Sequence, residues 1–126
     1  MRFLVCPPDY FQIDYEINPW MRRANGVDPA RALGQWQTLM KVLEQEVGAG
    51  LERMQPVQGL PDLVFTANAG LVVGRRALVS RFRYPERQRE EAHFERWFRK
   101  QGYEVLTLDP SLYFEGAGDL LGFADT

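Results

Sequence analysis

Apolar positions that recur every three or four residues predict a helix in the first half of the chain. The recurring positions are Leu33, Trp36, Met40, Leu43 and Val47. This spacing places them on one face of a helix. Asp28 and Pro29 precede the pattern as a cap acceptor and a first-turn proline, and glycines at 48 and 50 end it.

A second helical pattern begins at Pro85. Its apolar face carries Phe94, Trp97 and Phe98 among many charged residues, and Gly102 follows its last turn. The second half of the chain is therefore expected to carry one highly charged helix with a narrow apolar face.

Short apolar runs outside these helices predict strands. The runs cover residues 3–6, 51–57, 71–73, 77–80 and 103–108, and a further strand is expected to start at 120–123. Gly74 and the two arginines after it predict a hairpin turn. From residue 69 to 108 the order is strand, strand, helix, strand, and the residues before 61 follow the same plan with one strand missing. The predicted class is α/β.

Two segments do not follow either periodicity. Residues 9–25 form a long loop rich in aromatic residues, and a structured loop of this length is uncommon unless it binds or covers something. Residues 61–74 (PDLVFTANAGLVVG) begin as an apolar extended run, which Thr66 and Asn68 interrupt beside small residues. This pattern is typical of one wall of a pocket, but more often of a strand, a tight turn and a second strand.

Composition restricts the class of protein. The chain has 126 residues, 45% of them hydrophobic and 25% charged, as in one ordinary globular domain. A net charge of −2 argues against a nucleic-acid partner. The absence of a twenty-residue apolar run and of a basic-then-apolar leader argues against a membrane span or a secretory signal. Cys6 is the single cysteine, which excludes a disulfide scaffold and favours the cytoplasm.

The sequence predicts no cofactor. Metal-binding and phosphate-binding motifs such as CxxC, HxxxH and GxxxxGK[ST] are missing from it. Cys6 follows a predicted buried strand and is interpreted as a small core residue. His93 lies among helix charges and is interpreted as a surface or half-buried side chain. Neither is expected to be catalytic.

Three segments together resemble the guanidine-modifying enzymes. They are residues 16–21 (EINPWM), the PDLVFTANAG run, and residues 114–119 (FEGAGD). That superfamily includes arginine deiminases, dimethylarginine dimethylaminohydrolases and amidinotransferases. The chain is most similar to the arginine dihydrolase type, which carries an asparagine, like Asn68, where deiminases carry an aspartate.

The resemblance implies a pentein-like fold, a five-bladed α/β propeller of strand–strand–helix–strand modules, of which this chain covers only the N-terminal portion. We therefore expect a single domain over residues 1–126, with one module at about 1–60, a second at about 61–110 and the start of a third at 111–126. In such a propeller the strand missing from the first module is supplied by the C-terminal end of the enzyme.

The resemblance also implies roles for individual residues. Glu115 is the catalytic acid that orients the guanidinium, with Gly116 and Gly118 allowing the backbone to turn; the alternative is a glycine-rich turn whose acid caps backbone N–H groups. Asn68 contacts the guanidinium, and Asp119 supports the same wall and is assigned to substrate binding.

Arg87 is expected to bind the substrate carboxylate, since a planar fork suits it. Its alternative is a solvated arginine at a helix start, and Arg81, Arg83 and Arg89 are rivals for the role. Asn18 either holds the amino-acid end of the substrate or belongs to a turn with Pro19. Asp62 is expected to fix its loop rather than to touch substrate.

The family's nucleophilic cysteine and catalytic histidine correspond to positions beyond Thr126, so the chain by itself is expected to be inactive. The leading hypothesis is the substrate-binding part of a hydrolase acting on guanidino C–N bonds, with arginine or a similar compound as ligand. The alternative is a short binding module that forms a homodimer through open sheet edges. A third reading is a structural relative, because propellers of this kind also occur in a ribosome-associated translation factor.

Overall fold

Five strands and two α-helices occur in residues 1–120, the part of the chain that the computed structural model describes. The chain divides into two compact units, Met1–Thr66 and the residues from Ala67 onward, and each is described by itself. The predicted mixed α/β class is confirmed. The predicted start of a strand at 120–123 lies, apart from Leu120, outside the described residues.

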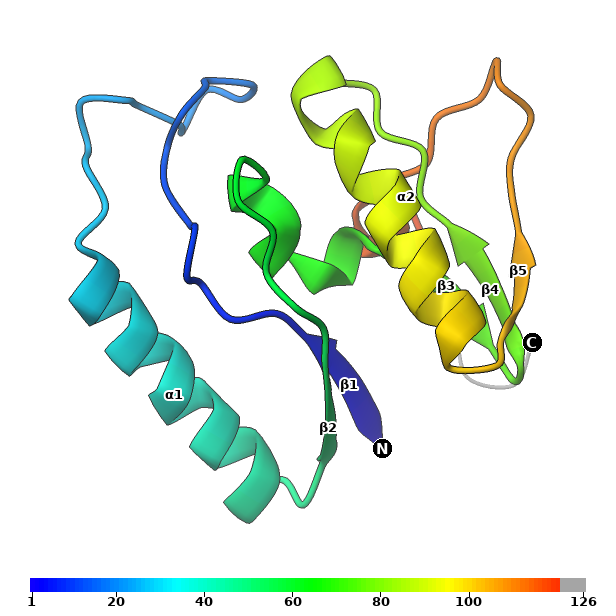
Figure 1. Ribbon diagram of the computed structural model, residues 1–126, viewed down its shortest axis with the longest axis horizontal. Coiled ribbons are helices and arrows are strands. Elements are labelled where there is room, and N and C mark those ends of the chain that lie inside the picture. Colours follow the sequence, from blue (N-terminus) through cyan, green and yellow to red (C-terminus); the bar gives the residue numbers. More distant parts are fainter. Residues whose placement is uncertain (121–126) are drawn as a thin grey trace. The chain divides into compact units, whose positions relative to one another are not determined.

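The first unit is built from two parallel strands and the helix that connects them. β1 (Arg2–Val5) pairs with β2 (Gly50–Arg53) in parallel register. A parallel pair needs a crossover connection, and α1 (Pro29–Gln45) supplies it, lying beside both strands in Figure 1. The Asp28 carboxylate accepts hydrogen bonds from the N–H groups of residues 30 and 31, which confirms the predicted helix start.

The extended conformation predicted for the beginning of residues 61–74 is wrong. The chain forms two short 3₁₀ helices there, η1 (Pro61–Val64) and η2 (Thr66–Asn68). Pro61 occupies the first turn of η1, where its fixed φ is favourable, and the Asp62 carbonyl accepts the Phe65 N–H at 2.9 Å. A run of only three apolar residues carries no period that could separate a strand from such a turn.

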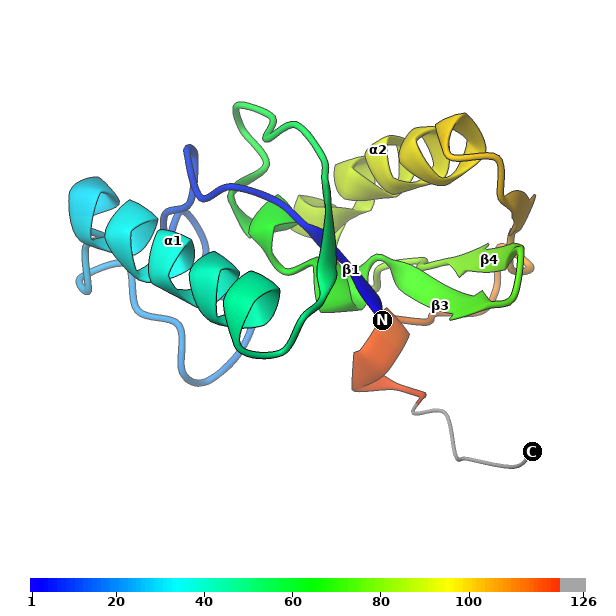
Figure 2. The same ribbon diagram turned by 90° about the horizontal axis from the view of Figure 1, so that it is seen from below.

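The second unit is a three-stranded sheet with one helix on it. β3 (Gly70–Val73) and β4 (Arg76–Val79) form the predicted hairpin, and β5 (Glu104–Leu106) pairs with β4 in parallel. α2 (Pro85–Lys100) connects β4 to β5 and lies on one face of the sheet in Figure 2. The predicted order of strand, strand, helix and strand is confirmed. The strands predicted at 51–57 and 103–108 are shorter than expected.

The buried face of α2 differs from its apolar pattern. Phe94 and Phe98 are buried as predicted, but Trp97 is only half-buried. Two charged residues one and two turns earlier, Arg87 and Glu90, complete the buried face instead. The four buried positions follow each other at steps of three, four and four residues, which is the spacing of one helix face.

None of the helices in residues 1–120 combines the length and the apolar character needed to cross a membrane.

A glycine is required at the start of the short helix η3 (Gly116–Gly118). Gly116 has a φ of +60°, and a Cβ there would lie 2.5 Å from the carbonyl oxygen of Ala67 and 3.0 Å from the Cα of Asn68. A side chain would therefore meet backbone atoms as well as an unfavourable left-handed conformation. Gly118 differs: a Cβ there would make only ordinary contacts, the nearest at 3.7 Å to Asn68 Nδ2.

We therefore expect Gly116→Ala to lower the free energy of unfolding by about 2 kcal/mol or more, combining the left-handed conformation with the backbone overlap. Gly118→Ala is the matched control and should change the stability by no more than about 0.5 kcal/mol. Urea denaturation followed by circular dichroism measures both. Equal effects of the two substitutions would contradict the close packing of η3 on residues 67 and 68.

Candidate functional site

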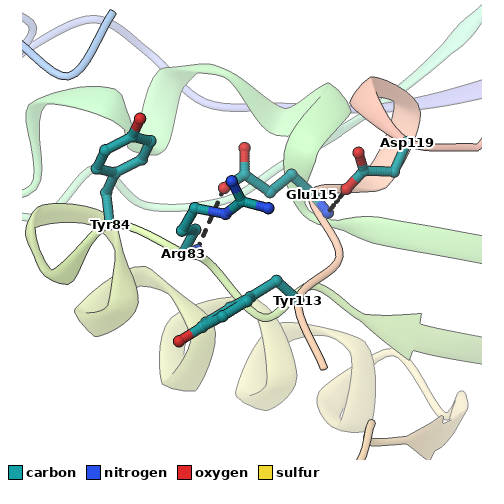
Figure 3. Close-up of a pocket in the computed structure, with 5 residues that line it drawn as sticks. All are labelled: Arg83, Tyr84, Tyr113, Glu115 and Asp119. Carbon is teal, nitrogen blue, oxygen red and sulfur yellow. Dashed lines mark hydrogen bonds between the residues drawn. The ribbon is translucent and has the colours of Figure 1, made fainter. Parts of the chain in front are cut away.

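An open pocket of about 300 Å³ lies in the second unit. Its lining, drawn in Figure 3, consists of Arg83, Tyr84, Tyr113, Glu115 and Asp119. Two segments far apart in the sequence form it: the connection between β4 and α2, and residues 113–119, which include η3. They are held together by a pair of backbone hydrogen bonds between Arg81 and Phe114, at 2.8 and 3.0 Å.

The two carboxylates of the pocket are anchored to the backbone. Glu115 Oε1 accepts the N–H of Arg83 at 3.2 Å, and Asp119 Oδ2 accepts the N–H of Glu115 at 2.7 Å (Figure 3). Asp119 therefore holds the residue that carries the predicted catalytic acid. The acid-capped turn that was the alternative interpretation of this segment is present, and a catalytic role of Glu115 stays a prediction.

The pocket also carries a positive charge. The Arg83 guanidinium lies over the Tyr113 ring, 5.8 Å from its centroid. Arg83 is exposed, so this cation and the carboxylates border the same open volume. Such a surface is suited to a ligand that itself carries both signs of charge.

Asn68 connects the pocket segment to α2. Its Nδ2 donates to the carbonyl oxygen of Glu115 at 2.9 Å, and its Oδ1 accepts from Arg87 Nη1 at 3.1 Å. Three of the predicted site residues, Asn68, Arg87 and Glu115, are thus brought into one hydrogen-bonded chain. Asn68 is the last residue of η2 and precedes β3, so its position depends on the 3₁₀ turn that replaced the predicted strand.

Arg87 is buried, with 7% of its surface exposed, so the alternative of a solvated helix-start arginine is wrong. Its guanidinium donates to both carboxylate oxygens of Glu90 and lies 4.3 Å from the Phe82 ring centroid. Among its rivals, Arg83 lines the pocket, whereas Arg81 donates through Nε to the carbonyl of Pro110 at 3.1 Å. Arg89 lies on the exposed side of α2. Binding of a substrate carboxylate by Arg87 stays a prediction.

Two predicted residues belong to the first unit. Asn18 Oδ1 accepts the N–H groups of Trp20 and Met21 at 3.0 and 3.1 Å, so the predicted turn is present; a role of Asn18 in substrate binding stays a prediction. Asp62 is 4% exposed within η1, and its role in fixing the loop stays a prediction.

Neither Cys6 nor His93 is among the residues that line this pocket. Cys6 is buried in the core of the first unit, as predicted, with 1% of its surface exposed. His93 is half-buried on α2, where burial and the neighbouring Arg96 guanidinium lower its pKa below the ordinary 6.5. Residues 1–120 contain no cluster of three or more His, Cys, Asp or Glu side chains that could hold a metal ion.

Glu90 is the residue of this region that sequence reasoning missed. Its side chain is fully buried, and it pairs with Arg87 at 2.8 Å. The signal was available in the helical spacing, because positions 87, 90, 94 and 98 share one face. The predicted apolar face, Phe94, Trp97 and Phe98, does not include it.

Comparison with known proteins gives a consistent result, although no family model matches the chain. The bifunctional arginine dihydrolase/ornithine cyclodeaminase AgrE of Nostoc is 49% identical over 122 residues, covering 96% of this chain and 17% of AgrE. The corresponding enzyme ArgZ of Synechocystis is 45% identical with the same coverage. The N(G),N(G)-dimethylarginine dimethylaminohydrolase of Mycobacterium tuberculosis is 38% identical, covering 95% of this chain and 39% of that enzyme.

Solved structures of these relatives share the fold. A crystal structure of AgrE with L-arginine bound superimposes with a TM-score of 0.86 over 94% of this chain and 17% of the AgrE chain. The substrate-bound N-terminal domain of ArgZ, 45% identical, gives the same TM-score over 94% of this chain and 43% of that domain. The chain spans less than half the length of each of these relatives. It belongs to the guanidine-modifying superfamily and matches the N-terminal portion of its arginine dihydrolases and dimethylarginine dimethylaminohydrolases.

Proposed function

We propose that the chain forms the N-terminal, substrate-binding part of a hydrolase that acts on the guanidino C–N bonds of arginine or a related compound. The observation that carries the proposal is the hydrogen-bonded chain from Arg87 through Asn68 to Glu115 beside a pocket with two carboxylates. AgrE, whose crystal structure with L-arginine shares this fold, is 49% identical to the chain over 122 residues.

A guanidinium ion is a planar cation with N–H donors around its edge, and a carboxylate is the acceptor whose two oxygens match it. Glu115 and Asp119 supply such groups at the pocket. In the proposed reaction a thiolate attacks the guanidinium carbon, and a histidine protonates the departing ammonia and activates water. Both groups would come from the part of such enzymes that lies outside this chain, and Glu115 would orient the guanidinium for them.

Asn68 distinguishes the chain from a deiminase. Its amide both donates and accepts hydrogen bonds, so it suits a neutral ureido group as well as a cationic guanidinium. We infer that the complete enzyme hydrolyses twice and releases ornithine rather than stopping at citrulline.

The two units would be successive modules of a five-bladed propeller. The enzyme would work in the cytoplasm.

The alternative is a binding module that pairs with a second copy of the chain. In the second unit β3 is an edge strand, and Val72 and Val73 on it are 43% and 68% exposed. An exposed apolar edge strand is a template for pairing. Sedimentation of the purified chain separates the two cases, because the alternative requires a dimer in the absence of any other protein.

The isolated chain is expected to bind guanidinium compounds weakly through Glu115. Titration with L-arginine, followed by ¹⁵N NMR, should shift the signals of Asn68, Glu115 and Asp119. Glu115→Gln should weaken the affinity by about tenfold or more, because one charge-assisted hydrogen-bond acceptor is lost. Glu86→Gln, which changes an exposed acid of α2 outside the pocket lining, should leave it unchanged. Equal affinities for the two variants would contradict the proposal.

A chimera tests whether the reaction requires the part of these enzymes that lies outside this chain. Residues 1–126 would replace the matching 43% of the ArgZ N-terminal domain, so that ArgZ supplies the rest of the domain. The chimera should release ammonia from arginine, the isolated chain should not, and Glu115→Gln in the chimera should reduce kcat by about 100-fold or more. Turnover by the isolated chain at the rate of the chimera would place the chemistry on Cys6 or His93 instead.

Asn68→Asp in the same chimera tests the second hydrolysis. A carboxylate favours the cationic guanidinium over the neutral ureido group, so the product should shift from ornithine toward citrulline. Amino-acid analysis of the reaction mixture measures the ratio, and an unchanged ratio in an active variant would refute this role of Asn68.

A further inference from the structure

An ion pair is buried on the sheet-facing side of α2. The side chains of Arg87 and Glu90 are 9% and 0% exposed. Arg87 Nη2 donates to Glu90 Oε2 at 2.8 Å, and its Nε donates to Glu90 Oε1 at 3.1 Å. A buried pair of this kind is often no more stabilising than apolar residues of the same size. The geometry of the pair therefore says more about its role at the site than its contribution to stability does.

The pair fixes the plane and direction of the Arg87 guanidinium. One edge of the guanidinium is held by the Glu90 carboxylate, and its face lies on the Phe82 ring, with 4.3 Å between the central carbon and the ring centroid. The remaining nitrogen, Nη1, is then directed at Asn68 Oδ1, 3.1 Å away. A lysine could not reproduce this, because its ammonium lacks the planar fork.

Asn68 is held in one orientation from both of its ends. Oδ1 faces a guanidinium, which can only donate, and Nδ2 faces the carbonyl oxygen of Glu115, which can only accept. A flip of the amide would place donor against donor and acceptor against acceptor. The orientation is thus decided by Arg87 on one side and by the backbone of the pocket segment on the other.

We propose that Glu90 is a positioning residue of the candidate site: by holding Arg87, it sets the amide orientation of Asn68 and thereby the group that Asn68 presents to a ligand. The consequence for ligands rests on the proposed function. The positioning itself concerns the protein without ligand and can be tested separately.

The test uses ¹⁵N NMR of the whole 14.6 kDa chain, with the Asn68 side-chain amide and the Arg87 Nε–H as probes. In the unmodified protein the Asn68 amide should be as ordered as the backbone, with an order parameter of about 0.85. Glu90→Gln should shift both probes and accelerate exchange of the Asn68 amide protons by about tenfold, as expected for loss of one hydrogen bond. Glu95→Gln, which removes the exposed partner of Arg99 on the same helix, should change neither probe.

A second variant covers the case in which Glu90→Gln leaves Arg87 buried without its counter-ion and unfolds the chain. Arg87→Met combined with Glu90→Leu removes both charges and keeps the buried volume, and in that folded protein the Asn68 amide should lose its fixed orientation. Unchanged Asn68 signals in a folded variant, or an order parameter below about 0.6 in the unmodified protein, would overturn the inference.

Arginine titration of the same samples separates this inference from the proposed function. If arginine shifts none of the pocket signals in the unmodified protein, the proposed function fails. The positioning by Glu90 is still decided by the spectra without ligand.

Discussion

A guanidinium group buried at the start of α2 connects the segments that make the candidate site. A guanidinium brings five N–H donors and a positive charge, so the burial of Arg87 requires a carboxylate and further acceptors around it. Glu90 provides the first and Asn68 the second. Asn68 in turn donates to the carbonyl oxygen of Glu115. The buried ion pair of α2 is therefore connected by hydrogen bonds to the backbone of the pocket. The positions of η2, α2 and η3 in the second unit therefore depend on one another.

The two carboxylates of the pocket beside this chain of hydrogen bonds have different roles. Asp119 binds the N–H of Glu115 and so orders the segment, whereas the Glu115 carboxylate reaches the N–H of Arg83 at the opposite wall. The close approach of Gly116 to residues 67 and 68 brings the two segments near enough for Asn68 to reach across. The side chains of Asn68, Glu115 and Asp119 are thus each anchored to the backbone of a neighbouring segment.

Much of this could be predicted from the sequence, and the exceptions have physical reasons. The TAN and FEGAGD segments pointed to Asn68, Glu115 and Asp119 because the resemblance is carried by short local motifs. The catalytic and binding roles of these residues stay predictions. The burial of Arg87 and its pairing with Glu90 could not be predicted from such motifs. Charged residues on helices are usually solvated, and only the packing of α2 on β4 decides which side of the helix is covered. The 3₁₀ turns at residues 61–68 were missed because a three-residue apolar run has no diagnostic period.

By itself the sequence determined the α/β class, both helices, the hairpin of the second unit and membership of the guanidine-modifying superfamily. These follow from periodicity, from glycine and proline at defined positions, and from short motifs, all of which act over a few residues. The tertiary structure alone decided that Arg87 is buried, that Glu90 holds it, and that Asn68 bridges α2 and the pocket segment. Those contacts join residues up to 47 positions apart, and their geometry exists only after the sheet and the helix have packed together.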